Sequence, residues 1–191
     1  MSGPTMAATL KTNVQALAEL LTRLDGLTAP TEKLVQAMLT CWKASGKVLI
    51  AGNGGSAADA MHFAEELLVR FHRNRKALAA IALCDPTILT CAGNDFGFDQ
   101  IFSRQVEGLG RPGDLLIVMS TSGNSRNLVL AVEAAKNIGM TTAAFLGKDG
   151  GALRDQCDVQ LLVPTEITHH VQEVHKLVFH AVCEWIDTQV D

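Results

Sequence analysis

The chain has 191 residues, which is enough for one sizeable hydrophobic core but not for two full domains. Hydrophobic residues make up 48% and charged residues 19%, below the roughly 25% charged share of a typical soluble domain, so we expect some surface to be buried between subunits. The 16 basic and 20 acidic residues give a formal net charge of -4 without any run of Lys or Arg, which argues against nucleic acid as a direct ligand.

Two further classes are disfavoured by the sequence. The N-terminal segment MSGPTMAATLKTNVQ lacks a basic region followed by an apolar stretch, and no segment approaches the roughly 18 apolar residues needed to cross a bilayer. The five cysteines are odd in number and never in a C-x-x-C spacing, so we predict neither a disulfide framework nor a cysteine zinc site. We expect a cytoplasmic protein with small buried apolar cysteines: Cys41, Cys84, Cys91, Cys157 and Cys183.

Apolar spacing gives the order of elements along the chain. Helical spacing predicts two helices first, over residues 7–24 and 31–44, the second after Pro30. Short apolar runs, which predict strands, then alternate with helical patterns. The expected strands span residues 47–52, 77–83, 114–120, 141–147 and 159–164. The remaining helices are expected at residues 56–71, 85–91, 99–109, 125–138, 152–156 and 168–188.

Continuous apolar strands separated by helices indicate a parallel sheet covered on both faces, because right-handed crossovers place helices above and below it. We predict an α/β fold: a three-layer α-β-α, doubly wound, flavodoxin-like domain with a five-stranded parallel sheet and extra N-terminal helices. The N-terminal helices are expected within residues 1–46 and the sheet domain within 47–191, as one structural unit. Two small domains are the alternative.

Two strand ends carry glycine and hydroxyl residues that lead directly into a helix. The first is Asn53-Gly54-Gly55-Ser56, and the second is Thr121-Ser122-Gly123-Asn124-Ser125. Glycine lets the backbone approach a ligand closely, and the unpartnered N–H groups of a first helical turn favour an anion. Neither loop matches a nucleotide-binding pattern. One such loop could be a turn that caps a helix, but two in one domain favour a phosphate ligand, with hydroxyl donors from Ser120, Thr121, Ser122 and Ser125.

Two helices carry polar side chains at spacings that place them on one face. His62 and Glu66 are four residues apart, and Gln172 and His180 are eight residues apart. Together they can close around a zinc ion or around the carbonyl and hydroxyl oxygens of a sugar, although glutamine is an uncommon zinc ligand. Spacing alone favours the plainer interpretation, in which His62 is a satisfied helix histidine and Glu66 belongs to a solvated face.

Two other segments are weaker candidates. Residues 93–98 form a polar segment flanked by aromatics, which we interpret as a turn in which Asn94 and Asp95 could hydrogen-bond sugar hydroxyls. Thr168, His169 and His170 could form a metal tract, but at a helix start they are more typical of capping and surface residues.

Four collinear segments carry a resemblance: AGNGGSAADAMHFAEEL, CAGNDFGFDQIFSRQVEGLGRPGD, STSGNS and VQEVH. They resemble the sugar isomerase (SIS) domain family, and specifically the phosphoheptose isomerases. The similarity covers nearly the whole chain and is most specific in the first two segments.

The resemblance implies an isomerase that converts D-sedoheptulose 7-phosphate to D-glycero-D-manno-heptose 7-phosphate, the first step towards ADP-heptose for lipopolysaccharide core or other heptose glycans. It also implies a homotetramer with active sites between subunits, one zinc ion per site and no nucleotide cofactor. The zinc ligands of the family correspond to His62, Glu66, Gln172 and His180. Its substrate contacts correspond to Asn53, Gly54, Gly55, Glu66, Asn94, Asp95, Ser120, Thr121, Ser122, Ser125 and Gln172.

Two non-catalytic classes share these features by the same resemblance: a protein that binds the bacterial replication initiator, and sugar-phosphate sensors. The initiator-binding protein lacks counterparts of Glu66 and His180, which this chain keeps. The sensors usually carry a DNA-binding helical domain, which would not fit before Lys47. The chain departs from the phosphoheptose isomerases at His170, where Arg is common, and over residues 165–169, and both differences concern the lid over the sugar.

The implied reaction moves a carbonyl group from C2 to C1 through an enediol. One base can serve both carbons, and Glu66 is our candidate because a carboxylate in an apolar pocket can act as a base near neutral pH. His180 would move a proton between the two oxygens or polarise the carbonyl. Zinc would stabilise the enediolate, but Glu66 bound to zinc would be a weaker base, and the sequence leaves these roles open.

Overall fold

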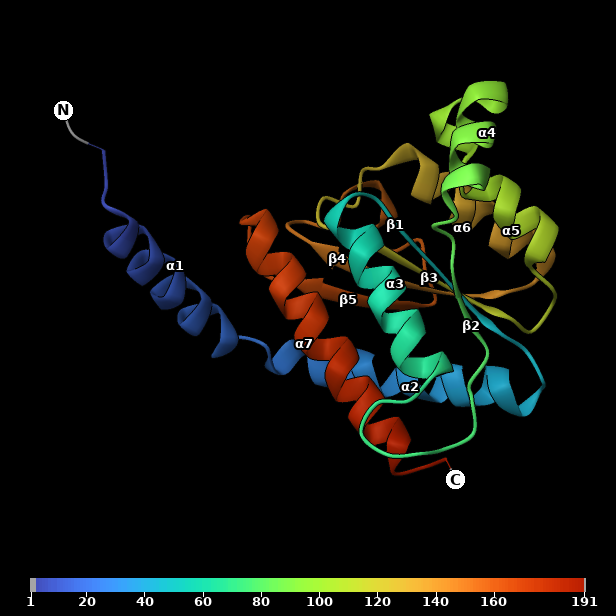
Figure 1. Cartoon of the computed structure of the whole chain (residues 1–191), viewed down its shortest axis with the longest axis horizontal. Helices are drawn as coiled ribbons and strands as arrows, with labels where there is room; N and C mark the ends of the chain where they lie inside the picture. The colour runs from blue at the N-terminus through green and yellow to red at the C-terminus, as the bar shows by residue number, and fades with distance from the viewer. Residues whose placement is uncertain (1–2, 191) are drawn as a thin grey trace.

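The computed structural model describes residues 3–190 and shows three layers with one helix extending from them (Figure 1). Five strands form the central sheet: β1 (Val48–Gly52), β2 (Ala80–Ala82), β3 (Leu115–Ser120), β4 (Thr141–Gly147) and β5 (Val159–Val163). The helices are α1 (Met6–Leu21), α2 (Thr28–Lys43), α3 (Gly55–Leu68), α4 (Pro86–Phe96), α5 (Ser103–Leu109), α6 (Arg126–Ile138) and α7 (Thr168–Asp187). The predicted α/β fold with a five-stranded parallel sheet is confirmed.

The order of the strands places the ends of β1 and β3 side by side. All strands are parallel, in the order β2-β1-β3-β4-β5. Strand β2 lies beside one edge of β1, and β3 lies beside the opposite edge of β1. The direction in which successive strands are added therefore reverses between β1 and β3. In open α/β sheets, ligands bind at such a reversal, outside the carboxyl ends of the strands. Gly52 pairs with Met119, so both predicted anion loops begin at this point.

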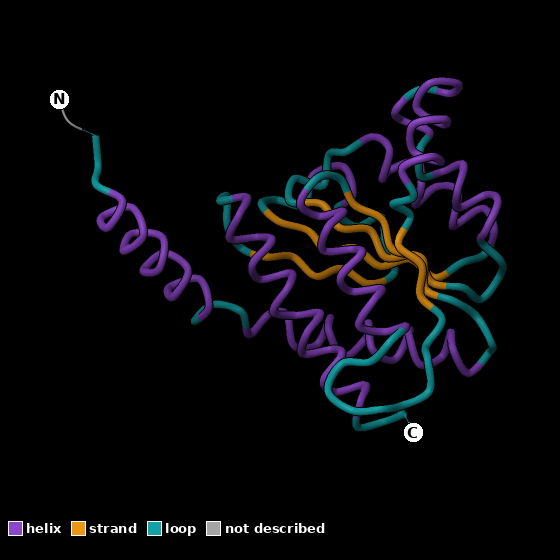
Figure 2. Tube along the Cα trace, in the orientation of Figure 1, coloured by secondary structure: helices purple, strands orange, loops and turns teal. Residues whose placement is uncertain are grey.

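Helices lie on both sides of the sheet (Figure 2), and a separate hydrophobic core fills the space between the sheet and the helices on each side. Ile50 and Ile117 belong to the core formed with α2, α3 and α7, whereas the neighbouring Leu49 and Leu116 belong to the core formed with α4, α5 and α6. Every residue of β1 and β3 is buried. Burial on both faces explains why these strands are continuous apolar runs instead of alternating patterns.

Several element bounds differ from the sequence predictions. Helix α2 begins at Thr28 and contains Pro30 in its first turn, where the missing N–H would have no intrahelical partner. Helix α1 ends at Leu21, three residues early, and β2 is shorter than the apolar run at 77–83. Residues 152–156 do not form an α-helix, because the chain makes only a 3₁₀ turn at Gly151–Leu153.

Helix α1 extends away from the body of the molecule (Figure 1), and its apolar side chains Met6, Leu10, Val14 and Leu21 are exposed. Across residues 3–190, none of the helices combines the length and apolar character that crossing a membrane requires. The suggested limits 1–46 and 47–191 include residues 1, 2 and 191, which lie outside the described part of the chain.

Candidate active site

The loop between β1 and α3 approaches the start of α7 so closely that a side chain would not fit. Gly54 has a φ of 56°, a conformation that favours glycine, and a Cβ on Gly55 would lie 2.4 Å from the Nε2 atom of Gln172. The Asn53 side chain exchanges two hydrogen bonds with that of Asn127 on α6, at 3.0 and 2.9 Å. The loop is therefore fixed to both α6 and α7.

The loop between β3 and α6 is folded by its own hydroxyl groups and held by a neighbouring turn. The Ser120 Oγ accepts a hydrogen bond from the Gly123 N–H at 3.0 Å, and the Ser122 Oγ accepts one from the Asn124 N–H at 3.3 Å. A Cβ on Gly123 would lie 1.8 Å from the carbonyl oxygen of Gly150. Ser125 occupies the N-cap position of α6, but its side chain makes no capping hydrogen bond. Its hydroxyl and the first N–H groups of α6 therefore remain available for an anion.

Helices α3 and α7 lie side by side (Figure 1) and run in the same direction, so their polar residues pair in order along one seam. Gln172 meets Gly55 at the start of the seam. One turn further, the Lys176 ammonium lies 3.3 Å from a carboxylate oxygen of the buried Asp59. One turn further again, His180 of α7 lies close to His62 and Glu66 of α3.

His62, Glu66 and His180 form a group in which one donor atom from each residue lies within 4.8 Å of the others. The His62 Nε2 and a Glu66 carboxylate oxygen are 3.1 Å apart, and the rings of His62 and His180 have centroids 5.0 Å apart. Two imidazoles and one carboxylate are a donor set that suits a divalent metal ion, and all three side chains are half-buried. The group could therefore hold a metal ion.

The environment of His180 favours its neutral form. Burial is the main cause that lowers the pKa of His180 below its usual value, and the nearby His62 and Lys176 lower it further. Glu66 and Asp59 act in the opposite direction. A neutral imidazole can bind a metal ion or exchange a proton with a substrate oxygen.

The structure does not bring all of the predicted residues together. Asn94 and Asp95 are exposed in the last turn of α4, where their side chains are joined by a hydrogen bond of 2.7 Å. The predicted turn at 93–98 is therefore wrong over residues 93–96, because the Asp85 N-cap and Pro86 start a helix that continues to Phe96. Figure 1 shows α4 standing away from α3 and α7.

The start of α7 and the cysteines also differ from expectation. His170 is 2% exposed, so its interpretation as a surface residue is wrong, whereas His169 is exposed and contacts the Asn13 Oδ1 at 2.9 Å. Neither histidine belongs to the His/Glu group. Cys41 and Cys183 are buried as expected, but Cys91 is exposed and Cys84 and Cys157 are only half-buried.

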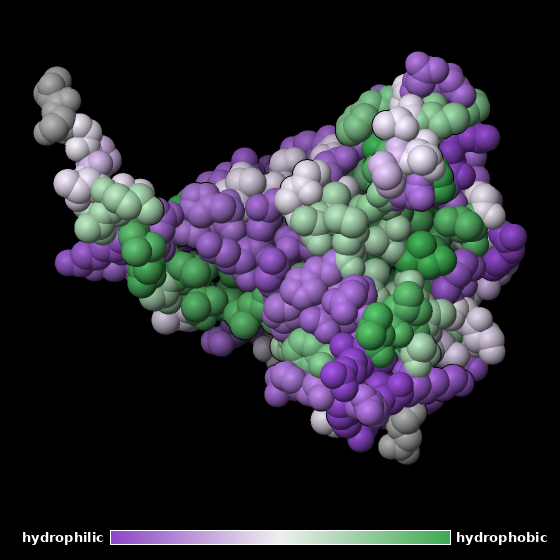
Figure 3. All heavy atoms as spheres, viewed as in Figure 1, coloured by the Kyte–Doolittle hydropathy of each residue, from purple (hydrophilic) through white to green (hydrophobic). Residues whose placement is uncertain are grey.

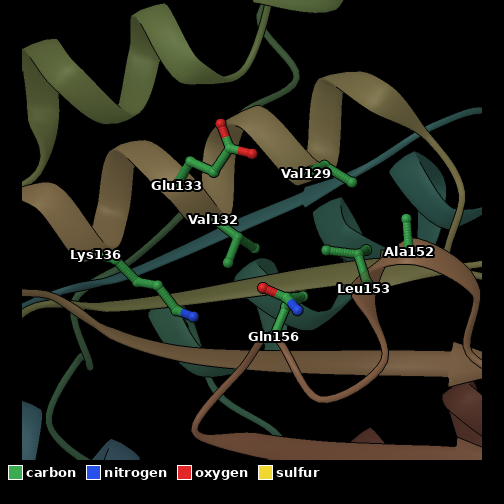
Figure 4. A pocket seen from close by; sticks show the side chains of 7 residues that line it. All are labelled: Val129, Val132, Glu133, Lys136, Ala152, Leu153 and Gln156. Atoms are coloured by element: carbon green, nitrogen blue, oxygen red, sulfur yellow. The ribbon is translucent and has the colours of Figure 1, made fainter.

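A small cavity of about 240 Å³ lies between α6 and residues 152–156 (Figure 4). Glu133 and Lys136 from α6 and Gln156 from the facing segment line it. None of the predicted site residues lines this cavity, so it is separate from the candidate site.

Comparison with known proteins identifies the family. Residues 13–147 match the family model of the SIS domain. Phosphoheptose isomerase from Trichlorobacter lovleyi is 51% identical over 162 residues, which cover 84% of this chain and 83% of that protein. The chain belongs to the phosphoheptose isomerases of the SIS domain family. It is accordingly an isomerase.

Other members of this family match over nearly the full chain. Phosphoheptose isomerase from Akkermansia muciniphila is 41% identical over 97% of this chain and 98% of that protein. The structure of a phosphoheptose isomerase from Francisella tularensis superposes with a TM-score of 0.93 at 36% identity, over 97% of this chain and 100% of that chain. The SIS domain match begins at residue 13, within α1 and before the expected limit at 46.

Sequence reasoning missed the residues that support the site. Asn127 is a buried polar residue in the first turn of α6, and Asp59 lies on the same helical face as His62 and Glu66, at spacings of three and four residues. Lys176 repeats the four-residue spacing between Gln172 and His180. These spacings were visible in the sequence, but the pairing across two helices required the structure.

Proposed function

We propose that this isomerase converts D-sedoheptulose 7-phosphate to D-glycero-D-manno-heptose 7-phosphate through an enediol. The observation that carries the proposal is the His62, Glu66 and His180 group on the α3–α7 seam, a seam that starts at the predicted anion loop after β1. The phosphoheptose isomerases to which the chain is similar supply the substrate class. We place the reaction at the start of ADP-heptose synthesis in the cytoplasm.

The phosphate group would bind in the loop after β3. Ser120, Thr121, Ser122 and Ser125 supply hydroxyl donors there, and the N-terminus of α6 favours negative charge. Because this group is remote from the reacting carbons, its binding energy can hold C1 and C2 in place for proton transfer. We assign the loop after β1, with Asn53, Gly54 and Gly55, to the sugar, together with Gln172.

The reacting carbons would lie beside Glu66 and His180. Glu66 would remove the proton from C1 and return a proton to C2. His180, kept neutral by its surroundings, would transfer a proton between O1 and O2 or polarise the carbonyl.

We propose that the metal is zinc, held by His62, Glu66, Gln172 and His180. Because zinc weakens a bound carboxylate as a base, Glu66 would act as the base only through an oxygen that is not bound to the ion. When bound, zinc supplies Lewis-acid stabilisation of the negative charge on the two oxygens. The three side chains already gathered here suit zinc. Gln172 lies against Gly55, about two turns before His180 on α7, and would have to turn towards the group to become the fourth ligand.

We also propose a homotetramer with active sites between subunits. In the isolated chain the apolar side of α1 lies exposed, and a groove of about 700 Å³ between α2 and α7 is lined by Leu27, Val35, Val178 and Trp185. Figure 3 shows apolar surface running from α1 onto the body of the molecule. Assembly would cover these surfaces, and the exposed Asn94 and Asp95 would then reach a neighbouring site. Residues 1–46 would serve mainly this assembly, and residues 47–191 would form the catalytic SIS domain.

The test is an assay of purified protein with D-sedoheptulose 7-phosphate, with product identified by mass and chromatography, in the presence of zinc and after chelation. The proposal predicts turnover that falls on chelation and returns with zinc. Binding of the sugar phosphate without turnover under every metal condition would overturn it in favour of a sensor or an initiator-binding protein.

A further inference from the structure

The buried side chain of Arg75 lies where α3 ends, in the segment between α3 and β2. It is 0% exposed. Its Nη2 donates a hydrogen bond to the carbonyl oxygen of Glu66 at 2.7 Å, and its Nη1 donates to the carbonyl oxygens of Leu67 at 2.8 Å and Lys76 at 3.0 Å. The carbonyl groups of a last helical turn have no intrahelical partners, so one guanidinium satisfies two of them. One of the two belongs to the residue that carries the proposed base.

The same guanidinium reaches α7. Arg75 Nε donates to the Oδ1 of Asp187, the last residue of α7, at 2.8 Å. The Oδ2 of Asp187 accepts hydrogen bonds from the backbone N–H groups of His72 at 2.9 Å and Arg73 at 3.3 Å. Although burial acts to raise it, these hydrogen bonds lower the pKa of Asp187, so the carboxylate is charged at neutral pH.

We propose that Arg75 and Asp187 are positioning residues, which set the register of α3 against α7 and thereby the distances among His62, Glu66 and His180. The inference rests on the proposed function of that group. Its evidence is the unbroken path of hydrogen bonds from the Glu66 backbone through Arg75 to the end of the helix that carries His180.

The geometry of the seam explains why register matters. The seam is fixed at its start by Gln172 against Gly55 and at its end by Arg75 with Asp187, and the His/Glu group lies between. A slide of one residue moves a helix by about 1.5 Å along its axis. The three donor atoms lie within 4.8 Å of one another, so such a slide would separate ligands that must meet on one ion.

A buried ion pair is a weak source of stability, because the cost of removing both charges from water offsets their attraction. The hydrogen bonds of the Arg75–Asp187 pair are directional, so they form in one register of the two helices and not in another. Apolar packing discriminates less between registers. That property fits a positioning role.

The chain contains a matched control at the opposite end of the sheet. Asp114, which precedes β3, is 2% exposed, pairs with the Lys47 side chain, and accepts hydrogen bonds from the backbone N–H groups of Lys47 at 2.9 Å and Arg111 at 2.8 Å. It thus has the same kinds of partners as Asp187 but lies at the amino ends of β1 and β3, away from the candidate site.

The experiment compares Asp187→Asn and Arg75→Lys with Asp114→Asn in the full-length protein. Zinc affinity of the metal-free protein is measured by competition with a chromophoric chelator, at a temperature where all variants are folded. We expect Asp187→Asn and Arg75→Lys to bind zinc at least about tenfold more weakly, as is common when a group that orients metal ligands is lost. They should lower kcat with little change in KM, because the phosphate loop is untouched. Asp114→Asn should lower stability while leaving zinc affinity within about twofold of the wild type.

Equal zinc affinity in Asp187→Asn and Asp114→Asn would overturn the inference while the proposed function stands. Crystal structures of the two variants give a readout that needs neither metal nor activity. A shift of α7 along α3 in Asp187→Asn alone supports the positioning role, and an unchanged seam contradicts it. A wild-type protein that neither binds zinc nor turns over would instead remove the proposed function, and the crystal structures would still decide the role of the pair in the seam.

Discussion

The α3–α7 seam and helix α1 are both built from amphipathic helices, but they differ in where their inner faces find partners. In the seam, Gln172, Lys176 and His180 each meet a residue of α3 within the same chain. On α1, Leu10 and Val14 are each 58% exposed and Leu20 is its only buried residue. The difference teaches that the His/Glu group is gathered within one chain, whereas α1 leaves most of its apolar side chains exposed in that chain.

The largest expected effect comes from Glu66→Gln, which removes the proposed base from the seam and keeps its size. We expect kcat to fall by about 10⁴-fold, the upper range for loss of general base catalysis, while binding of the sugar phosphate is largely kept. Steady-state kinetics and calorimetric titration measure the two quantities. Near-normal kcat would remove Glu66 from the mechanism.

The second-largest effect is expected from substitutions on the exposed apolar side of α1. Leu10→Glu combined with Val14→Glu places charge on the apolar side of α1, and loss of about 2 kcal/mol of burial at each position should weaken assembly about a thousandfold. Sedimentation velocity measures the oligomer. Thr12→Glu lies on the opposite side of the same helix and serves as the control. Assembly that survives the double substitution would show that α1 is not an interface.

A third prediction concerns the buried His175, beside the seam. Burial lowers the pKa of His175 to about 4 from its usual value of 6.5, although its hydrogen bond to the Leu146 carbonyl acts to raise it. The unfolded chain therefore binds a proton first as pH falls. Stability from this histidine is full above pH 6.5 and is lost towards pH 4, by about 3 kcal/mol in total.

Urea unfolding at several pH values measures this loss. His175→Asn should be less stable at neutral pH but lose less stability on acidification. His169→Asn, at an exposed histidine, should keep the slope of the wild type. An unchanged slope in His175→Asn would contradict the account.

The smallest effect is expected from Ser122→Ala, which removes one hydroxyl from the proposed phosphate loop. A hydrogen bond to a charged group contributes about 1.5 kcal/mol or more, so KM should rise about tenfold with little change in kcat. Initial-rate kinetics give both values. Unchanged KM would place the phosphate elsewhere.

The sequence predicted the elements with strong local signals and missed those that depend on contacts. The apolar runs at 47–52 and 114–120 identified the two central strands, and the four-residue spacing of His62 and Glu66 predicted a shared face that the structure confirms. The sequence predicts a helix over residues 85–91 and a turn over 93–98, whereas α4 continues to Phe96 and so includes Asn94 and Asp95. The composition of residues 93–98 is as typical of a helix end as it is of a turn.

Residues whose role depends on partners far away in the chain have no local sequence pattern that identifies them. Arg75 and Asp187 are 112 positions apart, and neither has a spacing that singles it out. The burial of His170 is likewise set by tertiary packing at the start of α7, against the usual exposure of a helix terminus. Sequence patterns report local periodicity, whereas these residues owe their environment to the folded chain.

The most direct test of the central claim is isomerisation of D-sedoheptulose 7-phosphate in deuterium oxide, followed by mass spectrometry and NMR of the product. Proton removal and return by a base through an enediol predicts that solvent deuterium enters at C2 of the aldose over many turnovers, and that Glu66→Gln shows no exchange. Product formed at a normal rate without any solvent deuterium would contradict proton transfer by Glu66 and point to direct transfer of hydrogen between the two carbons.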